Sequence, residues 1–296
     1  MATVDRTLLA WYRSHKRDLP WRKTRDPYRI FVSELMLQQT QVDRVVPKYQ
    51  GWLKTFPSWK TLANATTAGL IHAWAGLGYN RRALYAREAA RDVVKNGAPQ
   101  DEKGWRTLRG VGPYMAAALT EFVNGRRAIV IDTNIRRVVG RIFLGKPFPR
   151  PADDARIRPV LERITPRTNG HRDLPQAFMD FANAVCLPRS PRCTDCPLYA
   201  QCRAGKKFLR GTVRAPSRKK ITERMHREKK YPDRIYRGRI LAWVRTHGPT
   251  RHSELGTHID DAYDPIADRD WVRAMCARLV ADGLLAWVKK DSVSLP

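Results

Sequence analysis

Four cysteines lie close together in the sequence and indicate metal chemistry. Cys186, Cys193, Cys196 and Cys202 have the spacing C-x6-C-x2-C-x5-C, and no secretory signal is visible before them, which disfavours disulfides. Structural zinc usually takes two short cysteine pairs, whereas this array has one. The spacing therefore favours a [4Fe–4S] cluster, although thiolate ligands alone also permit zinc. The fifth cysteine, Cys276, lies in an apolar helical pattern typical of a core residue.

Two arginines, Arg189 and Arg192, stand between the first two cysteines in the segment CLPRSPRC. A cluster that folds this loop would turn both guanidinium groups outward, where they could contact phosphates. Such a cluster need not perform redox chemistry.

Two carboxyl groups are candidates for acid–base chemistry. Asp132 follows an apolar run and precedes a helix whose dipole and free N–H groups would keep it ionised, although taken alone the position is more typical of a plain N-cap. Glu34 lies in FVSELMLQQTQV among apolar and amide side chains, which would raise its pKa and keep it protonated. Two carboxyl groups in opposite protonation states are what glycosidic-bond cleavage requires. The sequence alone does not show whether positions 34 and 132 lie close together in the fold.

The segment LRGVGPY at residues 108–114 connects two helical patterns. Gly110, Val111 and Gly112 form a tight turn that exposes backbone N–H groups at the start of the next helix, and Pro113 suits its first turn. The turn alone is a weak signal. Together with the basic charge and the cysteine loop it indicates a helix-hairpin-helix that grips DNA phosphates.

The composition points to a polyanionic partner. Lys+Arg number 56 against 28 Asp+Glu, a formal net charge of +28, which favours nucleic acid over a mere solubility device. A hydrophobic fraction of 43% is typical of a globular chain, and no apolar run is long enough to span a bilayer. We therefore expect a cytoplasmic protein without a membrane partner.

The elements that must position these residues are mostly helices, since strand signals are scarce before residue 280. Asp26 and Pro27 suit the N-cap and first position of a helix. Helices are expected over 5–14, 28–45, 59–65, 67–75, 80–96, 101–108, 113–124, 134–143 and 174–186.

The region after the cysteines is strongly basic. Fifteen Lys/Arg stand against three Asp/Glu between Arg203 and Arg239, which predicts a basic linker over 206–232 that could release counterions from DNA or merely be solvated. Beyond it, helical patterns over 234–247, 252–258 and 268–282 precede two short strand patterns, LLAWV and SVSL. They indicate a winged-helix-like domain over 233–296, an arrangement as typical of a protein contact as of DNA reading.

The ordered motifs SELMLQQTQV, GLGYNRRA, LRGVGPYMAAAL, IDTNIRRVVGR and MDFANAVC, with the cysteine array, closely resemble the MutY family of adenine DNA glycosylases. This family belongs to the helix-hairpin-helix, iron–sulfur glycosylase superfamily that includes endonuclease III. The resemblance covers about residues 5–205, and the C-terminal part looks like the short tail of actinobacterial members. It implies a mostly α, two-lobed glycosylase core over 1–205, with a cluster lobe (1–21 and 132–205), a six-helix lobe (22–131) and an active site in the cleft between them.

The resemblance implies roles for individual residues. Glu34 would protonate the flipped adenine, Asp132 would stabilise or briefly bond to the oxocarbenium sugar, and Asn134 would order the site. Gln39 would wedge into the duplex and Tyr79 would stack beside the lesion on the opposite strand. The remaining implied positions are the base-pocket residues Trp21, Arg22, Leu37 and Asp180, and Gln38 and Thr40 as DNA contacts.

Tyr114 stands where the endonuclease III branch carries a lysine that attacks the sugar, so we expect a monofunctional enzyme that leaves the strand intact. We also expect a [4Fe–4S] cluster, no nucleotide cofactor and a possible monovalent cation at the hairpin. The expected partner is double-stranded DNA with a mispair, bound by a monomer associated with the bacterial nucleoid.

The chain departs from the MutY pattern at Asn80, Arg109 and Asn183. A compact tail also takes the place of the Nudix-like domain with which many MutY proteins sense 8-oxoguanine.

The expected reaction is removal of adenine opposite 8-oxoguanine or guanine. A thymine/uracil–guanine mismatch glycosylase is the alternative within the superfamily, although Gln38-Gln39-Thr40 favours the adenine branch. An iron–sulfur, winged-helix transcription regulator is the alternative from another class, but it leaves Glu34 and Asp132 without a role.

Overall fold

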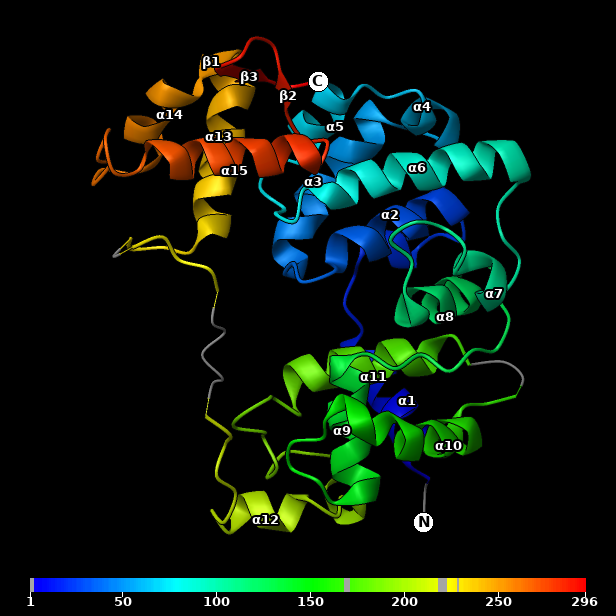
Figure 1. Cartoon of the computed structure of the whole chain (residues 1–296). Helices are drawn as coiled ribbons and strands as arrows, with labels where there is room; N and C mark the ends of the chain where they lie inside the picture. The colour runs from blue at the N-terminus through cyan, green and yellow to red at the C-terminus, as the bar shows by residue number, and fades with distance from the viewer. Residues whose placement is uncertain (1–2, 168–170, 218–222, 228) are drawn as a thin grey trace. The chain divides into compact units, whose positions relative to one another are not determined.

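The computed structural model describes residues 3–167, 171–217, 223–227 and 229–296. They form two compact units, each assembled from separate stretches of the chain, and Figure 1 labels their elements. The cysteine unit comprises Met1–Ile30, Pro99–Thr107 and Val111–Arg218; the winged unit comprises Phe31–Ala98, Leu108–Gly110 and Lys219–Pro296. No helix among the described residues is long and apolar enough to cross a membrane.

The cysteine unit is a bundle of helices with a non-helical loop that carries the four clustered cysteines. Its core forms where α1 packs against α11, α11 against α9, and α9 against α10. Leu8, Phe178 and Phe181 are fully buried between these helices, and Trp11 meets Phe181 edge to face. The helices are α1 (Val4–His15), α7 (Glu102–Trp105), α8 (Pro113–Phe122), α9 (Thr133–Leu144), α10 (Asp154–Ile164), α11 (Asp173–Ala184) and α12 (Gly205–Leu209).

The winged unit joins a helical lobe to the C-terminal part of the chain. In the lobe, α4 packs against α6 and α3 against α5, and the buried rings of Trp52 and Trp74 meet edge to face. The lobe helices are α2 (Pro27–Leu37), which begins in the cysteine unit, α3 (Val42–Thr55), α4 (Trp59–Ala63), α5 (Thr67–Ala73) and α6 (Arg81–Asn96).

The predicted helix over 28–45 is wrong in one respect, because the structure breaks it into α2 and α3. Its predicted start is confirmed: Asp26 accepts hydrogen bonds from the Tyr28 and Arg29 amides, and Pro27 is the first helical residue. The break at residues 38–41 contains Gln39, whose φ of 59° is left-handed and incompatible with a continuous helix. The turn presents an exposed Gln39 side chain that an unbroken helix would not.

The C-terminal part has the winged-helix order that the sequence indicates. Its elements are α13 (Asp233–His247), β1 (Thr250–Arg251), α14 (His252–Ile259), α15 (Arg269–Ala281), β2 (Ala286–Trp287) and β3 (Ser292–Ser294). The strands form an antiparallel sheet in the order β1-β3-β2, with Thr250 opposite Val293 and Trp287 opposite Val293. Strand β1 has only two residues, too short for an alternation signal, and the sequence does not predict it.

The end of the predicted basic linker packs against the C-terminal helices. The Lys229 side chain is 8% exposed, and its Nζ pairs with Asp260 at 2.6 Å and Asp268 at 2.5 Å. The His226 ring stacks on Trp271, with ring centroids 4.8 Å apart. Part of the positive charge of this stretch is thus neutralised internally, while residues 218–222 and 228 of it lie outside the described residues. The domain boundaries drawn from the sequence stay a prediction.

Candidate active site and cysteine loop

Asp132 is the N-cap of α9 and is held from two sides. Its Oδ1 accepts the Ile135 amide at 2.6 Å, and its Oδ2 accepts the Asn134 Nδ2 at 2.7 Å. Asn134 is in turn held by Arg137, whose guanidinium donates to the Asn134 Oδ1 at 3.1 Å. The carboxylate is therefore fixed in orientation by its own helix terminus and by a side chain that a second residue immobilises.

The sequence predicts that the start of the helix keeps Asp132 ionised, but in the structure burial opposes this effect on its pKa. Burial raises the pKa of this carboxyl above its ordinary value, against the opposing effect of the hydrogen bonds from Ile135 and Asn134 and the charge of Arg137. A desolvated carboxylate gains more from a nearby positive charge than a hydrated one does. The site is thus suited to a cation that develops close to Asp132.

Asp180 and Arg22, both predicted to line a base pocket, form an ion-pair cluster inside the cysteine unit. The buried Asp180 carboxylate accepts both terminal nitrogens of Arg22 at 2.7 and 2.9 Å, and the Arg17 Nε at 2.6 Å. Burial alone would raise the pKa of Asp180, but the hydrogen bonds and charges of the two arginines hold it below its ordinary value. This cluster fastens the turn that contains the buried Trp21 to α11. A pocket role for Trp21, Arg22 and Asp180 stays a prediction.

The winged unit carries Glu34 and the predicted site residues that follow it on α2 and in the turn after α2. Glu34 is 7% exposed and lies on α2 among buried apolar neighbours, as its sequence context suggests. Leu37 ends the helix and is half-buried, and Gln38 and Thr40 flank the exposed Gln39 in the break that follows. Since Glu34 and Asp132 belong to different units, their approach stays a prediction.

Gln39 and Tyr79, the two predicted wedges, share an unusual backbone conformation. Both have positive φ, 59° and 48°, and Tyr79 is 57% exposed although it is large and aromatic. A non-glycine residue in the left-handed region carries a conformational cost of about 1–3 kcal/mol that surrounding contacts must offset. Such strain is typical of residues whose side chains are presented to a ligand.

One buried side chain, Arg82, connects the turn at Gln38–Thr40 with the turn at Gly78–Tyr79; these are called the wedge turns below. Its guanidinium donates to the carbonyls of Gln38 at 2.5 Å and Gly78 at 3.1 Å, and to the Thr40 hydroxyl at 3.4 Å. It also lies near the Tyr79 ring, 5.6 Å from its centroid. Burial lowers the pKa of Arg82 to about 10, so the group remains a cation at neutral pH. No sequence pattern marks Arg82 for this role.

The helix-hairpin-helix turn has the expected geometry. Gly110 has a φ of +83°, which favours glycine, and a Cβ there would also lie a tight 3.2 Å from the Tyr85 side chain. Gly112 is exposed and caps α8, whose first residue is Pro113, whereas the Val111 side chain is buried. Tyr114 follows in the first turn of α8 and is half-buried. The backbone of the turn, rather than the Val111 side chain, is the part that can meet a phosphate.

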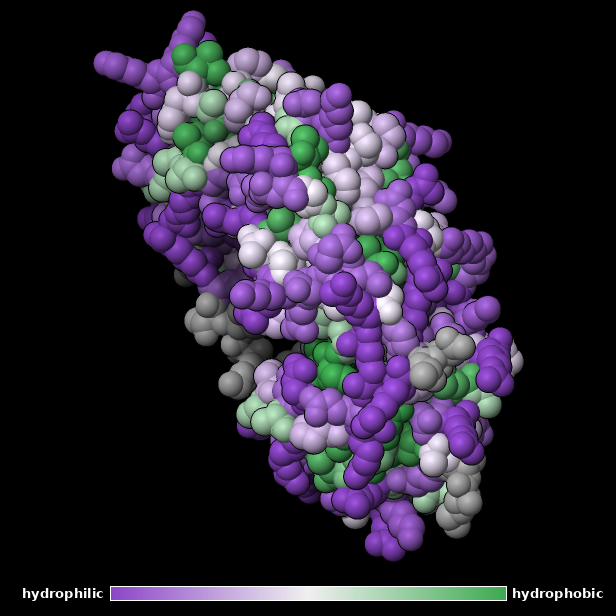
Figure 2. All heavy atoms as spheres, turned by 90° about the vertical axis from the view of Figure 1, so that its right-hand side faces the viewer, coloured by the Kyte–Doolittle hydropathy of each residue, from purple (hydrophilic) through white to green (hydrophobic). Residues whose placement is uncertain are grey.

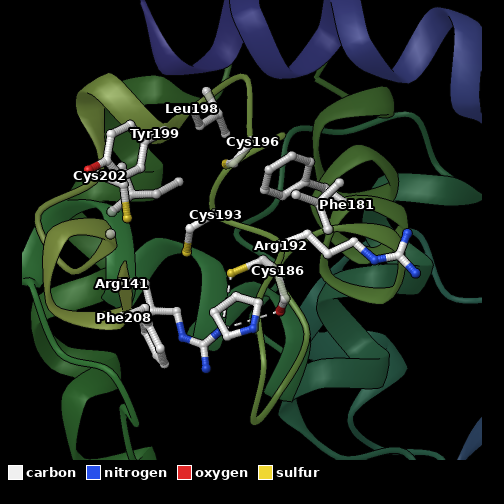
Figure 3. A pocket seen from close by; sticks show the side chains of 14 residues that line it. Arg141, Phe181, Cys186, Arg192, Cys193, Cys196, Leu198, Tyr199, Cys202 and Phe208 are labelled. Atoms are coloured by element: carbon white, nitrogen blue, oxygen red, sulfur yellow. Dashed lines mark hydrogen bonds between the residues drawn. The ribbon is translucent and has the colours of Figure 1, made fainter. Parts of the chain in front are cut away.

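The four clustered cysteines line one cavity in the cysteine unit. Figure 3 shows the sulfurs of Cys186, Cys193, Cys196 and Cys202 directed toward a shared space, enclosed by apolar side chains such as Phe181 and Leu198. Arg192 also lines the cavity but extends away from the sulfurs, and both it and Arg189 are exposed, as the sequence predicts. In the part of the chain that the structure describes, no group of three or more His, Cys, Asp or Glu is placed to hold a metal ion.

The donor set fits an iron–sulfur cluster. Four thiols line one apolar cavity, an arrangement that suits the four corners of a [4Fe–4S] cube. The fully buried Arg141 donates to the Cys186 Sγ at 3.3 Å and to the carbonyls of Leu187 and Pro188 at 2.7 and 2.6 Å. Arg141 thereby fixes the loop that begins at the first cysteine.

Comparison with known proteins identifies the family. Residues 32–169 match the model of the HhH-GPD superfamily base excision DNA repair proteins. An adenine DNA glycosylase of Mycolicibacterium smegmatis is 38% identical over 94% of this chain and 91% of its own length. This chain belongs to the HhH-GPD superfamily. The resemblance to adenine DNA glycosylases drawn from the sequence is confirmed.

Other members of the HhH-GPD superfamily match a shorter part of the chain. The adenine DNA glycosylase of Mycobacterium tuberculosis is 38% identical over 66% of this chain, which spans 65% of that relative's length, and the human one is 35% identical over 67% of this chain and 38% of its own. A thermostable thymine-DNA glycosylase superposes with a TM-score of 0.64 at 28% identity, over 69% of this chain and 95% of that one. An endonuclease III–DNA complex superposes with a TM-score of 0.61 at 20% identity, over 71% and 100%, and supports the fold alone. The mostly helical glycosylase fold expected from the sequence is therefore confirmed.

Three arginines that organise the site were not predicted. Arg137 and Arg141 lie one helical turn apart on α9, and both donate to carbonyls of the cysteine loop. Arg82 donates to carbonyls of the wedge turns. Arginines four residues apart in an otherwise apolar helix, as in IRRVVGR, are the signal that could have marked the α9 pair.

Proposed function

We propose that this protein is a DNA glycosylase that removes adenine mispaired with 8-oxoguanine or guanine by hydrolysing the N-glycosidic bond. The observation that carries the proposal is the 38% identity to an adenine DNA glycosylase along 94% of the chain. The desolvated Asp132 at the start of α9, held by Asn134, supports it chemically. A net charge of +28 supports DNA as the ligand.

In this proposal the two carboxyl groups divide the reaction. Glu34, buried on an apolar helix, donates a proton to the adenine ring and so improves the leaving group. As the bond breaks, positive charge develops on the sugar, and Asp132 stabilises it while Asn134 keeps the carboxylate aimed. The two roles need a protonated and an ionised carboxyl at the same pH.

Exposed residues of the winged unit handle the duplex. Gln39 enters the base stack and Tyr79 stacks beside the opposite strand, and together they offset the unstacking that base flipping requires. Arg82 keeps both turns in their strained conformation, because it bonds to the backbone on each side.

A [4Fe–4S] cluster is part of the proposal. Cys186, Cys193, Cys196 and Cys202 would ligate it, with Arg141 donating to the first thiolate. When bound, the cluster would brace the loop that displays Arg189 and Arg192 and would not act on the base. We further propose that the protein works as a monomer in the bacterial cytoplasm, on the nucleoid.

A panel of duplexes tests the proposed reaction. Purified protein is incubated with adenine opposite 8-oxoguanine, guanine or cytosine, and with thymine or uracil opposite guanine, and alkali then reveals which strand lost a base. We expect alkali-labile sites at adenine in the first two duplexes only. Cleavage at thymine or uracil would instead favour the alternative chemistry of the thymine-DNA glycosylase that superposes on this chain.

A further inference from the structure

The C-terminal domain, residues 233–296, separates its charges by face. Several of its acidic residues are engaged by cations: Asp260 and Asp268 pair with Lys229, Asp282 pairs with Arg81 and Arg237, and Asp233 pairs with Arg278. In the segment between α14 and α15, Asp260 and Asp268 are thus compensated, whereas Asp261 and Asp264 are exposed. The cations of α15 and of the β2–β3 hairpin are arranged differently.

Four exposed cations lie on one side of α15 and on the hairpin that follows it. Arg269 and Arg273 are one helical turn apart on α15, and Lys289 and Lys290 form the tip of the hairpin. None of the four forms an ion pair with any other residue that the structure describes. The acidic residues nearest to them in the sequence are the exposed Asp270 and the half-buried Asp291. The face keeps a positive excess that no described side chain neutralises.

An open groove runs between these cations. Arg273 and Ala277 line it from α15, and Trp287, Val288 and the two lysines line it from the hairpin. Trp287 is 37% exposed and Val288 is 54% exposed, so two neighbouring large apolar side chains face the solvent. The groove is therefore lined by the apolar Ala277, Trp287 and Val288 and by the cations Arg273, Lys289 and Lys290.

The electrostatic effect of the two arginines is visible on a neighbour. His252, at the start of α14, packs edge-on against Trp287. Burial lowers the pKa of His252, and the positive charges of Arg273 and Arg269 lower it further. Asp291 and Asp270 act in the opposite direction but do not outweigh them. The positive charges of Arg273 and Arg269 thus act on a ring that contacts Trp287 of the groove.

The domain is fastened to the lobe that carries the wedges. Asp282, directly after α15, pairs with Arg81 at 3.4 Å, and Arg81 is two residues from Tyr79. Helix α13 also packs against α5 of the same lobe. Because the domain is already fixed to the lobe, its surface can contact the same ligand as the lobe. It would lose less conformational entropy on binding than a flexible tail would.

From these observations we propose that Arg269, Arg273, Lys289 and Lys290, with the groove between α15 and the β2–β3 hairpin, form a second surface that binds duplex DNA through its phosphates. Charge complementarity selects a polyanion, and the exposed Trp287 and Val288 suit the sugars and groove edges beside the phosphates. The surface reads no particular sequence, since arginine and lysine contacts to phosphate carry no base information. It extends the duplex contact beyond the hairpin and wedge residues of the proposed glycosylase site.

Salt-dependent binding tests the proposal independently of catalysis. The Lys289→Ala/Lys290→Ala variant and an Arg273→Ala variant of the full chain are titrated with a fully paired 30-mer duplex at several salt concentrations. The matched control is Lys60→Ala/Lys95→Ala, which removes two exposed lysines from α4 and from the far end of α6. Because each lost phosphate contact lowers the slope of log affinity against log salt by about 0.9, we expect a fall of about 2 for the double hairpin variant. The Arg273→Ala variant should lose about 0.9, and the control should match the wild type.

Hydroxyl-radical footprinting of the same duplex completes the test. The wild type should protect a longer stretch of backbone than the hairpin double variant. An unchanged slope and an unchanged footprint in both hairpin and helix variants would overturn the proposal and leave the groove as a protein-binding surface. Since the duplex contains no mispair, a protein that failed to excise adenine would still give a clear result here.

Discussion

Arg137 and Asn134 form the link between the cysteine loop and the candidate catalytic carboxylate. The guanidinium of Arg137 donates to the Asn134 Oδ1 at 3.1 Å and, through its Nε, to the Cys186 carbonyl at 2.8 Å. Asn134 in turn orients Asp132, because the Asn134 Nδ2 donates a hydrogen bond to the Asp132 Oδ2. Two side chains, those of Arg137 and Asn134, therefore connect the loop to the Asp132 carboxylate through hydrogen bonds.

Arg137→Ala should slow excision because Asn134 loses the group that fixes its rotamer. Outer residues that orient a functional group typically cost about 10–100-fold when removed, and we expect a loss in this range in single-turnover excision of adenine. The control is Arg136→Ala, which removes the neighbouring arginine that pairs with Asp154 at 2.6 Å. Equal losses in the two variants would indicate a general destabilisation of α9 and contradict the specific role.

Glu34→Gln should abolish excision while leaving binding to mispaired duplex in place. The amide keeps the shape of the carboxyl but cannot give up a proton, and general acid catalysis contributes about 10²–10⁴-fold. Single-turnover rates and duplex affinity are measured side by side, with Glu162→Gln on the surface of α10 as control. Near-normal excision by the Glu34 variant would rule this residue out as the acid.

Arg82→Lys should weaken both the fold and mispair recognition. A single ammonium cannot reach the carbonyls on both wedge turns, and buried carbonyls left unpaired should lower the free energy of unfolding by about 2–4 kcal/mol. The neighbouring Arg81→Lys keeps a cation beside Asp282 in a partly exposed pair and should cost less than about 1 kcal/mol. Urea unfolding gives the stabilities, and the ratio of mispaired to paired duplex affinity gives the recognition. If the two variants lose the same stability and discrimination, the turns do not depend on Arg82.

Cys196→Ala should remove the cluster, whereas Cys276→Ala should not. The wild type is expected to be brown, with absorbance near about 400 nm and about four irons per chain. Cys276 is fully buried in α15, away from the cavity that the other four cysteines line, so its removal should leave iron content unchanged. Stoichiometric zinc in a colourless, active wild type prepared without oxygen would contradict the cluster assignment.

Tyr114→Lys should introduce strand-cleaving chemistry that the wild type lacks. A phenol cannot form a Schiff base, so the wild type should release the base and leave an intact strand until alkali is applied. A lysine in the first turn of α8 can present an amine to the sugar carbon, giving an adduct that borohydride traps. If Tyr114 serves only packing, the variant will be destabilised without any trapped adduct. Efficient trapping and strand cleavage by the wild type would overturn the monofunctional assignment.

Much of the local structure follows from short-range signals. The Asp26-Pro27 helix start, the cap at Asp132, the hairpin glycines and the winged-helix order all depend on residues within a few positions of each other. The cysteine spacing likewise indicated a shared site, and the structure places the four thiols around one cavity. Such features are encoded locally because the hydrogen bonds or ligands involved are neighbours in the chain.

The sequence could not place the break between α2 and α3, because MLQQTQV contains no glycine or proline and keeps a helical pattern. Only the tertiary structure decides it: the Arg82 guanidinium, 44 residues away, donates to the Gln38 carbonyl that the turn exposes, and it offsets the left-handed strain at Gln39. The same holds for Arg137 and for the arginines that surround Asp180. A buried arginine donates to carbonyls that the fold brings near it from distant parts of the chain. The helical periodicity of its own segment does not predict which carbonyls these are.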